Sequence, residues 1–453
     1  MIPGEEPEQM IMLSAHYDSY FTGFQDDNAA VAMMLGIART FIDMGYKPRK
    51  TLVFCAMAAE EWGVVDSKYD WSTGAYEQVF TAHPEWQGKV IADFNFELPA
   101  HAHGKKDAVR CTYEYASFMK KATEHIQPSK EAYPEGLEVH FPIQTWSDDF
   151  SIAIAGIPSS VNEFSDGEFM ETHYHSQFDN EDFYDEPVYR FHHNLYGKLV
   201  LAFDHTAVVP MDFERLFAAV EDSVDRKLCE KTEANETVLL ERLKKAKELG
   251  RQLYDQIQKI NETYKNLLET GKCEEAKAMA AEYAALNSSL LYIFRKEQDY
   301  FVRLNWHDDV LFPQQGVGEN LKAIYKALAC LKEDDPEGAL EAVYEIDNNR
   351  YAFLFDREVF RYFTEYVLNQ PADRLKWGYG RIIHHENLYD LVVSLKEKNK
   401  LQKAGERPDQ EEEYKILLQA ANAQEQCYRD DIDYMASSVE KLLAAMEGCV
   451  QKQ

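Results

Sequence analysis

The stretch "MIMLSAHYDSYFTGFQDDNAA", residues 10–30, begins as an apolar run and continues as a loop with one histidine and three aspartates. Similar apolar runs recur at 51–59, 89–97 and 157–164. Helical patterns lie between or after these runs, at 29–45, 111–126 and 186–209. Strands that are apolar almost throughout and alternate with helices are typical of a largely parallel sheet covered on both faces. The first part of the chain is therefore predicted to be an α/β fold, with a mostly parallel sheet flanked by helices.

The composition fits a globular protein with an acidic surface. The chain has 453 residues, of which 45% are hydrophobic, and this is enough for two or three domains with real cores. Its 79 acidic and 48 basic residues give a formal net charge of -31, which repels nucleic acid and anionic lipid. We therefore expect neither nucleic acid nor a membrane among the partners.

The cysteines indicate a reducing compartment. There are seven of them, an odd number, scattered without CxxC pairs. Free and mostly buried thiols in this pattern suit the cytoplasm. The first residues lack the basic and apolar segments of a secretion signal, and no run approaches the ~18 apolar residues of a membrane span. We expect a soluble cytoplasmic protein.

The second part of the chain changes character after Pro210, where long charged segments rich in Leu, Ala and Tyr replace the strands. We predict an α/β domain over 1–209 and an all-α helical domain over 210–453. From Leu239 to Leu267 the apolar positions step by four and three, a heptad seam that packs lengthwise against another helix. A partner helix within the chain is favoured, because most amphipathic helices serve their own core. The alternative is a homodimer through the helical domain.

The start of the chain raises a separate expectation. The first predicted strand begins after only nine residues. A strand of an α/β sheet usually lies between neighbours, and those of this strand could come from sequence upstream of residue 1. We therefore expect that the 1–209 domain lacks upstream sequence.

Polar clusters follow four predicted strands, at the edge where α/β sheets bind their ligands. They are His16, Asp18, Asp26 and Asp27; Glu60 and Glu61; Glu97, His101 and His103; and His173, Tyr174, His175 and Asp179. Each alone has an ordinary explanation, because acidic residues are mostly solvated. Together they would converge on one crevice, where a pair of divalent cations would offset the repulsion. Imidazole and carboxylate ligands without thiolates suit zinc in a site kept open to water.

The order of these motifs resembles the two-zinc aminopeptidase family that also contains glutamate carboxypeptidase. The motifs are H-x-D-S, G-x-x-D-D, E-E-x-G, a strand-end acid and Y-H. The segments "ARTFIDMGYKPRKTLVF" and "WSDDFSIAIAGIP" are also similar, so that the resemblance covers most of residues 10–205. It implies a zinc-exopeptidase-like sandwich. The helical part resembles the dimerisation domain of the glutamate carboxypeptidase and transferrin receptor branch by position and character only.

The resemblance implies a role for each motif residue. The ligands of two divalent ions, with zinc favoured, would be His16, Asp26, Glu61, Glu97 and His175. Asp18 would orient the imidazole of His16. Glu60 would act as general base, and Tyr174 would help to stabilise the oxyanion. His101 and His103 would be either outer partners of the ligands or ordinary loop histidines.

Two of these positions have alternatives. Asp26 is preferred to Asp27 as the bridge between the ions because Gly23 lies three positions earlier, and the family often holds the peptide bond between the two aspartates in cis. The family usually has aspartate where this chain has Glu97, so that the longer side chain could shift the metal. Asp93, on the same face of the strand, is a weaker substitute.

These roles predict a metal-dependent exopeptidase. A water activated by the two metals would attack the peptide carbonyl, while Glu60 takes its proton and returns it to the leaving amine. Peptides with a free N-terminus are the preferred substrates, because acidic walls attract the α-amine. A carboxypeptidase acting on acidic dipeptides is the second hypothesis, although no arginine lies in the motif loops. The third is a non-catalytic receptor or scaffold, disfavoured because every ligand position holds a competent side chain.

Overall fold

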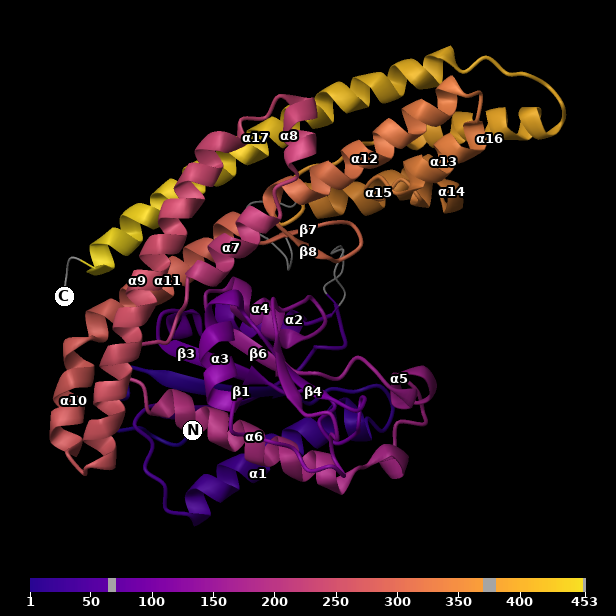
Figure 1. Ribbon diagram of the computed structural model, residues 1–453. Helices are drawn as coiled ribbons and strands as arrows, with labels where there is room; N and C mark the ends of the chain where they lie inside the picture. Colours follow the sequence, from indigo (N-terminus) through magenta and orange to yellow (C-terminus); the bar gives the residue numbers. More distant parts are fainter. Residues whose placement is uncertain (64–70, 370–379, 451–453) are drawn as a thin grey trace.

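The computed structural model describes residues 1–63, 71–369 and 380–450. In these ranges a sheet covered by helices forms a compact body, from which an array of long helices rises and curves away (Figure 1). The strands of the body are β1 (Met10–His16), β2 (Thr51–Met57), β3 (Val90–Asn95), β4 (Asp107–Cys111), β5 (Leu137–His140) and β6 (Ser159–Asn162). Its longer helices are α1 (Ala30–Asp43), α2 (Thr73–Glu77), α3 (Ala116–Thr123), α4 (Asp148–Ile154), α5 (Glu168–Thr172) and α6 (Glu186–Asp204). Short helical turns are η1 (Phe24–Ala29), η2 (Gln78–Ala82), η3 (Pro84–Trp86), η4 (Tyr113–Tyr115) and η5 (Glu181–Phe183).

The sheet has the order β2-β1-β3-β6-β4-β5. The four strands expected from the apolar runs, β1, β2, β3 and β6, pair in parallel. β4 is antiparallel to β6, and β5 is parallel to β4. The predicted α/β class with a mostly parallel sheet is thus confirmed. β1 lies between β2 and β3, so that both of its neighbours come from this chain, and the expectation of missing upstream sequence stays a prediction.

Two helical layers cover the sheet, and its central strand β1 is apolar on both faces. Ile11, Leu13 and Ala15 of β1 point to one side, where they pack with α1, α3 and α6. Met10 and Met12 point to the other side, where they pack with α2, η2 and α4. This alternation is the period of two that a strand imposes. Figure 1 shows α1 and α6 below the sheet and α2 and α4 above it.

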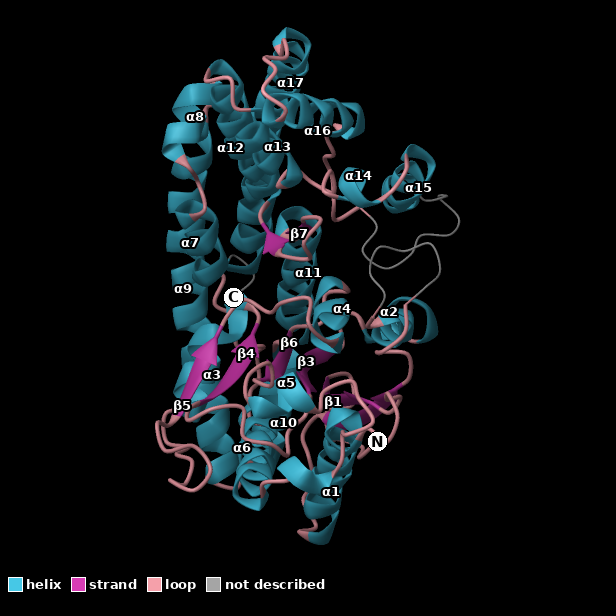
Figure 2. Ribbon diagram, turned by 90° about the vertical axis from the view of Figure 1, so that its right-hand side faces the viewer, coloured by secondary structure: helices cyan, strands magenta, loops and turns pink. Residues whose placement is uncertain are grey.

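The second half of the chain is helical apart from a small hairpin of β7 (Arg303–Leu304) and β8 (Val310–Leu311) in its described residues (Figure 2). The helices are α7 (Glu214–Asp222), α8 (Arg226–Thr232), α9 (Glu236–Glu269), α10 (Cys273–Glu282), α11 (Ala284–Phe301), α12 (Pro313–Lys332), α13 (Pro336–Tyr344), α14 (Tyr351–Leu354), α15 (Arg357–Leu368), α16 (Tyr389–Lys403) and α17 (Glu411–Val450). The predicted all-α region is confirmed. The charged segment 396–413 is helical at both ends, as part of α16 up to Lys403 and of α17 from Glu411.

The heptad seam of α9 is buried within this chain. Leu239, Leu243 and Leu253 are fully buried, and α9 packs against α7 and α17. A side chain at Gly250 would place its Cβ 2.8 Å from the backbone nitrogen of Glu214, so that glycine allows the close approach of α7. The seam is therefore used inside the molecule, as favoured above, and the homodimer stays a prediction.

One polar residue of α9 that departs from the heptad seam connects the helical half to the end of the α/β half. Asn261 is buried in place of Ile260. Its side-chain oxygen accepts hydrogen bonds from the backbone N–H groups of Ala207 and Val208, both at 2.9 Å, and its amide donates to the Val208 carbonyl at 2.8 Å. One apolar core runs from the sheet through this connection into α7 and α9. The boundary at 209/210 therefore stays a prediction.

Two further observations bear on the expected compartment. None of the seven cysteines forms a disulfide. Among the helices of the described ranges, we find none with the length and apolar character that crossing a bilayer requires.

Candidate metal centre

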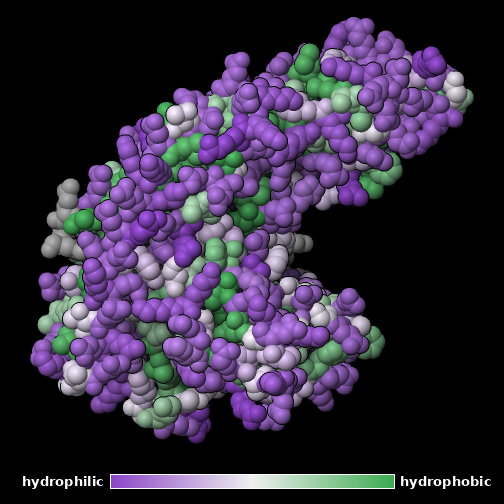
Figure 3. Space-filling view, viewed as in Figure 1, coloured by the Kyte–Doolittle hydropathy of each residue, from purple (hydrophilic) through white to green (hydrophobic). Residues whose placement is uncertain are grey.

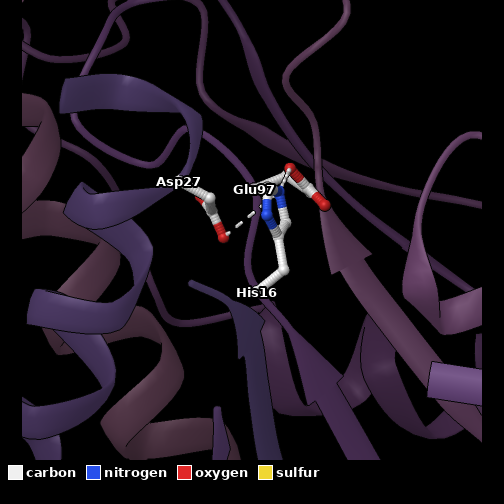
Figure 4. A group of neighbouring side chains, drawn as sticks. All are labelled: His16, Asp27 and Glu97. Carbon is white, nitrogen blue, oxygen red and sulfur yellow. Dashed lines mark ion pairs between the residues drawn. The ribbon is translucent and has the colours of Figure 1, made fainter. Parts of the chain in front are cut away.

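His16, the last residue of β1, lies at the centre of the predicted site and is 1% exposed. Its Nδ1 donates a hydrogen bond to the backbone carbonyl of Asp18 at 2.9 Å, because a carbonyl oxygen can only accept. This leaves Nε2 as an acceptor that faces carboxylates. Nε2 lies 3.6 Å from Glu97 Oε2 and 3.9 Å from Asp27 Oδ2 (Figure 4).

Asp26 connects this group to a second imidazole. Its Oδ1 lies 3.2 Å from His16 Nε2, and its Oδ2 lies 3.2 Å from His175 Nε2. His175 Nε2 is also 3.1 Å from Glu61 Oε2. Asp27 makes no such connection, since its Oδ1 accepts from the N–H of Leu98 at 3.1 Å. The peptide bond between Asp26 and Asp27 is cis.

Two aspartates hold the loops that carry these residues. The carboxylate of Asp18 accepts from the backbone N–H groups of Glu60 and Glu61, both at 3.2 Å. This carboxylate lies 3.6 Å from His16 Nδ1. The hydrogen bond to the imidazole ring is therefore made by the backbone carbonyl of Asp18 and not by the predicted carboxylate. Asp179 accepts from the N–H groups of Gln25 at 2.8 Å and Asp26 at 3.0 Å. Sequence reasoning gave Asp179 no role, although it lies four residues after His175.

Glu97 reaches the cluster in spite of its extra methylene. Its Oε1 accepts from the hydroxyl of Ser147, which leaves Oε2 directed at His16. Its backbone N–H donates to Asn162 Oδ1 at 2.9 Å. The substitute considered above, Asp93, accepts instead from the hydroxyl of Ser14 at 2.8 Å, farther back in the sheet. Ser147 and Asn162 were not predicted, because a hydroxyl and an amide carry no specific sequence signal.

The two loop histidines lie outside the cluster. His103 Nε2 pairs with Asp107 Oδ1 at 3.0 Å. His101 is buried, and its ring lies 4.9 Å from that of Phe169 between centroids. Neither contacts the carboxylates around His16.

Burial and mutual contact shift the pKa values of the cluster. Burial raises the pKa of Glu61 to about 7 and that of Glu60 well above its usual range. Burial also favours a higher pKa for Asp26, but its contacts with the imidazoles of His16 and His175 outweigh burial and lower the pKa to about 2. For His175 burial opposes protonation, yet Asp26 and Glu61 raise the pKa to about 9. Five carboxyl groups thus face two imidazoles, an excess of negative charge that bound cations would offset.

The donor set fits divalent metal ions. Three buried atoms of the cluster have no hydrogen-bond partner among the described residues: His16 Nε2, Asp27 Oδ2 and Glu61 Oε1. Ligand atoms also group within 4.8 Å of one another in overlapping triplets, namely His16, Asp27 and Glu97; Asp26, Glu61 and His175; and His16, Glu60 and Glu61. Buried polar atoms without partners are costly, and imidazole with carboxylate is the donor set of open zinc sites.

A cavity of about 410 Å³ opens beside the cluster. It is lined by Tyr20, Glu60, Glu61, Trp71, Trp146, Phe164, Ser165, Met170, Tyr174 and His175. The ring of Tyr174 stacks on that of His175 at 3.7 Å between centroids. The described lining contains no arginine or lysine. It offers an aromatic surface next to the carboxylates.

The N-terminal part, with its sheet and its cluster of imidazoles and carboxylates, is similar to known peptidases. Residues 1–200 match the model of Peptidase family M28, which agrees with the resemblance in the sequence. "Probable glutamate carboxypeptidase VP8" of Zea mays is 23% identical over 254 residues, which are 49% of this chain and 32% of the relative. The "Glutamate carboxypeptidase 2 homolog" of Caenorhabditis elegans is 39% identical over 67 residues, which are 14% of this chain and 9% of the relative.

Among solved structures, BSAP, a zinc aminopeptidase from Bacillus subtilis, is similar to this chain. The similar region covers 44% of this chain and 45% of BSAP. The identity is 22% and the TM-score is 0.34. The chain spans about a third or less of the length of the two curated relatives above.

Proposed function

We propose that the chain is a metal-dependent aminopeptidase that releases N-terminal residues from peptides with the help of two divalent ions, zinc being favoured. The observation that carries this proposal is the placement of Asp26, whose two oxygens each lie 3.2 Å from a different imidazole. A carboxylate in this position fits a bridge between two ions. His16 and Glu97 would complete one ion's ligands, and His175 and Glu61 those of the other. When bound, such ions lower the pKa of water and polarise a carbonyl group.

Glu60 is suited to move the proton. It lines the cavity, is 7% exposed, and its Oε2 lies 4.0 Å from His16 Nε2, farther than the contacts of Asp26 and Glu61. Its buried surroundings raise its pKa well above the usual range, which brings it closer to that of a base working near neutral pH. We assign it the removal of a proton from water and the return of that proton to the leaving amine.

Tyr174 is suited to assist at the carbonyl oxygen. Its ring stacks on His175 and lines the cavity, and burial raises its pKa, so that the hydroxyl keeps its proton. A protonated hydroxyl beside the scissile bond donates a hydrogen bond to a developing oxyanion.

The cavity favours an amine over a carboxylate as the group to be recognised. Glu60 and Glu61 would attract the α-ammonium group, while the described lining offers no arginine or lysine to a substrate carboxylate. The nearby Arg110 lies over the ring of Trp146, 5.0 Å from its centroid, and pairs with Glu163 at 3.5 Å. The aromatic lining suits apolar N-terminal side chains.

Hydrolysis assays test this proposal. The metal-replete protein should release arylamine from leucyl- and phenylalanyl-arylamides and should lose this activity on N-acetylated analogues, which lack the free amine. Preferential cleavage of acidic dipeptides with a blocked N-terminus would support the carboxypeptidase instead. Absence of hydrolysis with metals bound would support the non-catalytic scaffold.

We also propose a cytoplasmic location and a homodimer through residues 210–453. The first is supported by the finding that none of the seven cysteines forms a disulfide. For the second, a dimer would have to use helix faces other than the buried seam of α9. Fractionation of the native cells and light scattering after size exclusion test these two statements.

A further inference from the structure

A second cavity, of about 420 Å³, lies where the sheet meets the helical half. Its walls come from η4, α7, α11 and the chain from β8 into α12. Most lining side chains are apolar, among them Leu216, Phe301, Val302, Leu311 and Phe312. In Figure 3 apolar residues gather at this waist between the body and the helices. The rim is polar, since Asp222 is exposed and Gln315 is half-buried. The size and lining fit a small-molecule site.

Two carboxyl groups line this apolar cavity without a counter-charge. Glu114, on η4, is 1% exposed and Glu297, on α11, is fully buried. None of their four carboxylate oxygens has a hydrogen bond of good geometry among the described residues, although the two carboxyl groups interact with each other and Glu114 interacts with the hydroxyl of Thr112. A buried carboxylate in such a state is costly, and native proteins normally pair it with a donor or a cation. The two groups therefore point to a ligand that supplies one.

Their mutual electrostatics agree with this. Burial raises the pKa of Glu114 to about 7. Burial also raises the pKa of Glu297 well above its usual range, and the adjacent Glu114 adds to the rise. Two carboxyl groups that share a site hold on to one proton between them. A single positive charge can replace that proton.

We propose that this cavity binds a small amphipathic amine, with its ammonium group between Glu114 and Glu297 and its apolar body against the aromatic and aliphatic lining. A bare divalent cation fits less well, because calcium takes six to eight oxygen ligands and the walls around the two carboxyl groups are largely apolar. An anionic ligand is excluded by the two acids.

This site is separate from the metal centre. β4 runs antiparallel to β6, so that η4, which follows β4, lies at the opposite edge of the sheet from the carboxyl ends of β1 and β3. No residue of the second cavity lines the first. The inference therefore does not depend on the proposed peptidase activity, and its test uses binding alone.

Calorimetric titration of the full chain with 4-phenylbutylamine, compared with the neutral 4-phenylbutanol, tests the proposal. We expect an amine site that is retained in the Glu61→Gln variant, in which binding at the metal centre is impaired. Glu297→Gln should weaken amine binding at least tenfold and leave alcohol binding unchanged, while the exposed Glu282→Gln should change neither. Equal amine affinity in the wild-type chain and the Glu297→Gln variant would overturn the proposal, as would tight binding of calcium in place of the amine.

Two further variants keep the test decisive. An amine bound at the metal centre would be lost in Glu61→Gln and kept in Glu297→Gln, which is the reverse of our expectation. If Glu297→Gln fails to fold by circular dichroism, Ala219→Phe, which fills the cavity from α7, takes its place. This variant should abolish binding of both the amine and the alcohol, and retained binding would overturn the proposal.

Discussion

Glu60→Gln separates proton transfer from metal binding. The amide has nearly the size of the carboxylate but cannot accept the proton of water. General acid–base catalysis contributes typically about 10²–10⁴-fold, so that kcat should fall by this factor, equivalent to about 3–5 kcal/mol of activation free energy. Metal content should not change. Asp26 and Glu61 lie 3.1–3.2 Å from the imidazole nitrogens, whereas Glu60 lies 4.0 Å from the nearest one.

The assay is steady-state hydrolysis of leucyl-arylamide together with metal analysis of the same preparation. Glu61→Gln is the matched control, since it alters a proposed ligand one residue away and should lose metal as well as activity. Thermal unfolding shows whether each variant is folded. A Glu60→Gln variant with unchanged kcat would refute the assignment of the base, and one that loses a metal ion would make Glu60 a ligand.

Three other predictions concern the bridge, the second cavity and the connection between the halves. Asp26→Ala should reduce metal content more than Asp27→Ala, because only Asp26 contacts both imidazoles; the reverse result in elemental analysis would move the bridge to Asp27. Folding raises the pKa of Glu114 from 4.5 to about 7, so that the native state keeps a proton that the unfolded chain releases. The free energy of unfolding should therefore fall as pH rises between these values, by at most about 1.4 kcal/mol per pH unit, and urea titrations of Glu114→Gln should show a smaller slope. Asn261→Ala removes three buried hydrogen bonds and should cost about 3 kcal/mol in denaturant unfolding, whereas the exposed Asn266→Ala should cost less than about 0.5 kcal/mol.

The parallel part of the fold could be predicted because its strands are unusually clear in the sequence. The runs that became β1, β2 and β3 are largely apolar, as buried parallel strands are, whereas β6 has one apolar residue, Val161, and follows the apolar pair at 157–158. β4 and β5 escaped prediction because they are short and interrupted by charged residues, Asp107 and Arg110 in β4 and Glu138 in β5, and because β5 is half-buried at the edge of the sheet. A short edge strand has too few buried positions for a recognisable period.

The sequence indicated which residues would gather at the site, but it indicated only some of the contacts between them. His16, Asp26, Glu61 and His175 lie in or just before the loops that connect the predicted strands and helices. Such positions can be recognised directly in the sequence. The contact of Asp18 with His16 runs through a backbone carbonyl, and Asp179 acts on backbone N–H groups more than 150 positions earlier. Backbone groups are the same in every residue, so that such contacts leave no trace in the sequence.

The central claim is that Asp26 and its neighbours hold two metal ions that serve hydrolysis. The most direct test is elemental analysis of the purified chain after zinc loading and removal of free metal, with leucyl-arylamide hydrolysis followed as a chelator withdraws the ions. We predict about two ions per chain and activity that falls with metal content and returns on zinc addition. A chain that retains no metal under these conditions, or whose hydrolysis persists without metal, would contradict the account.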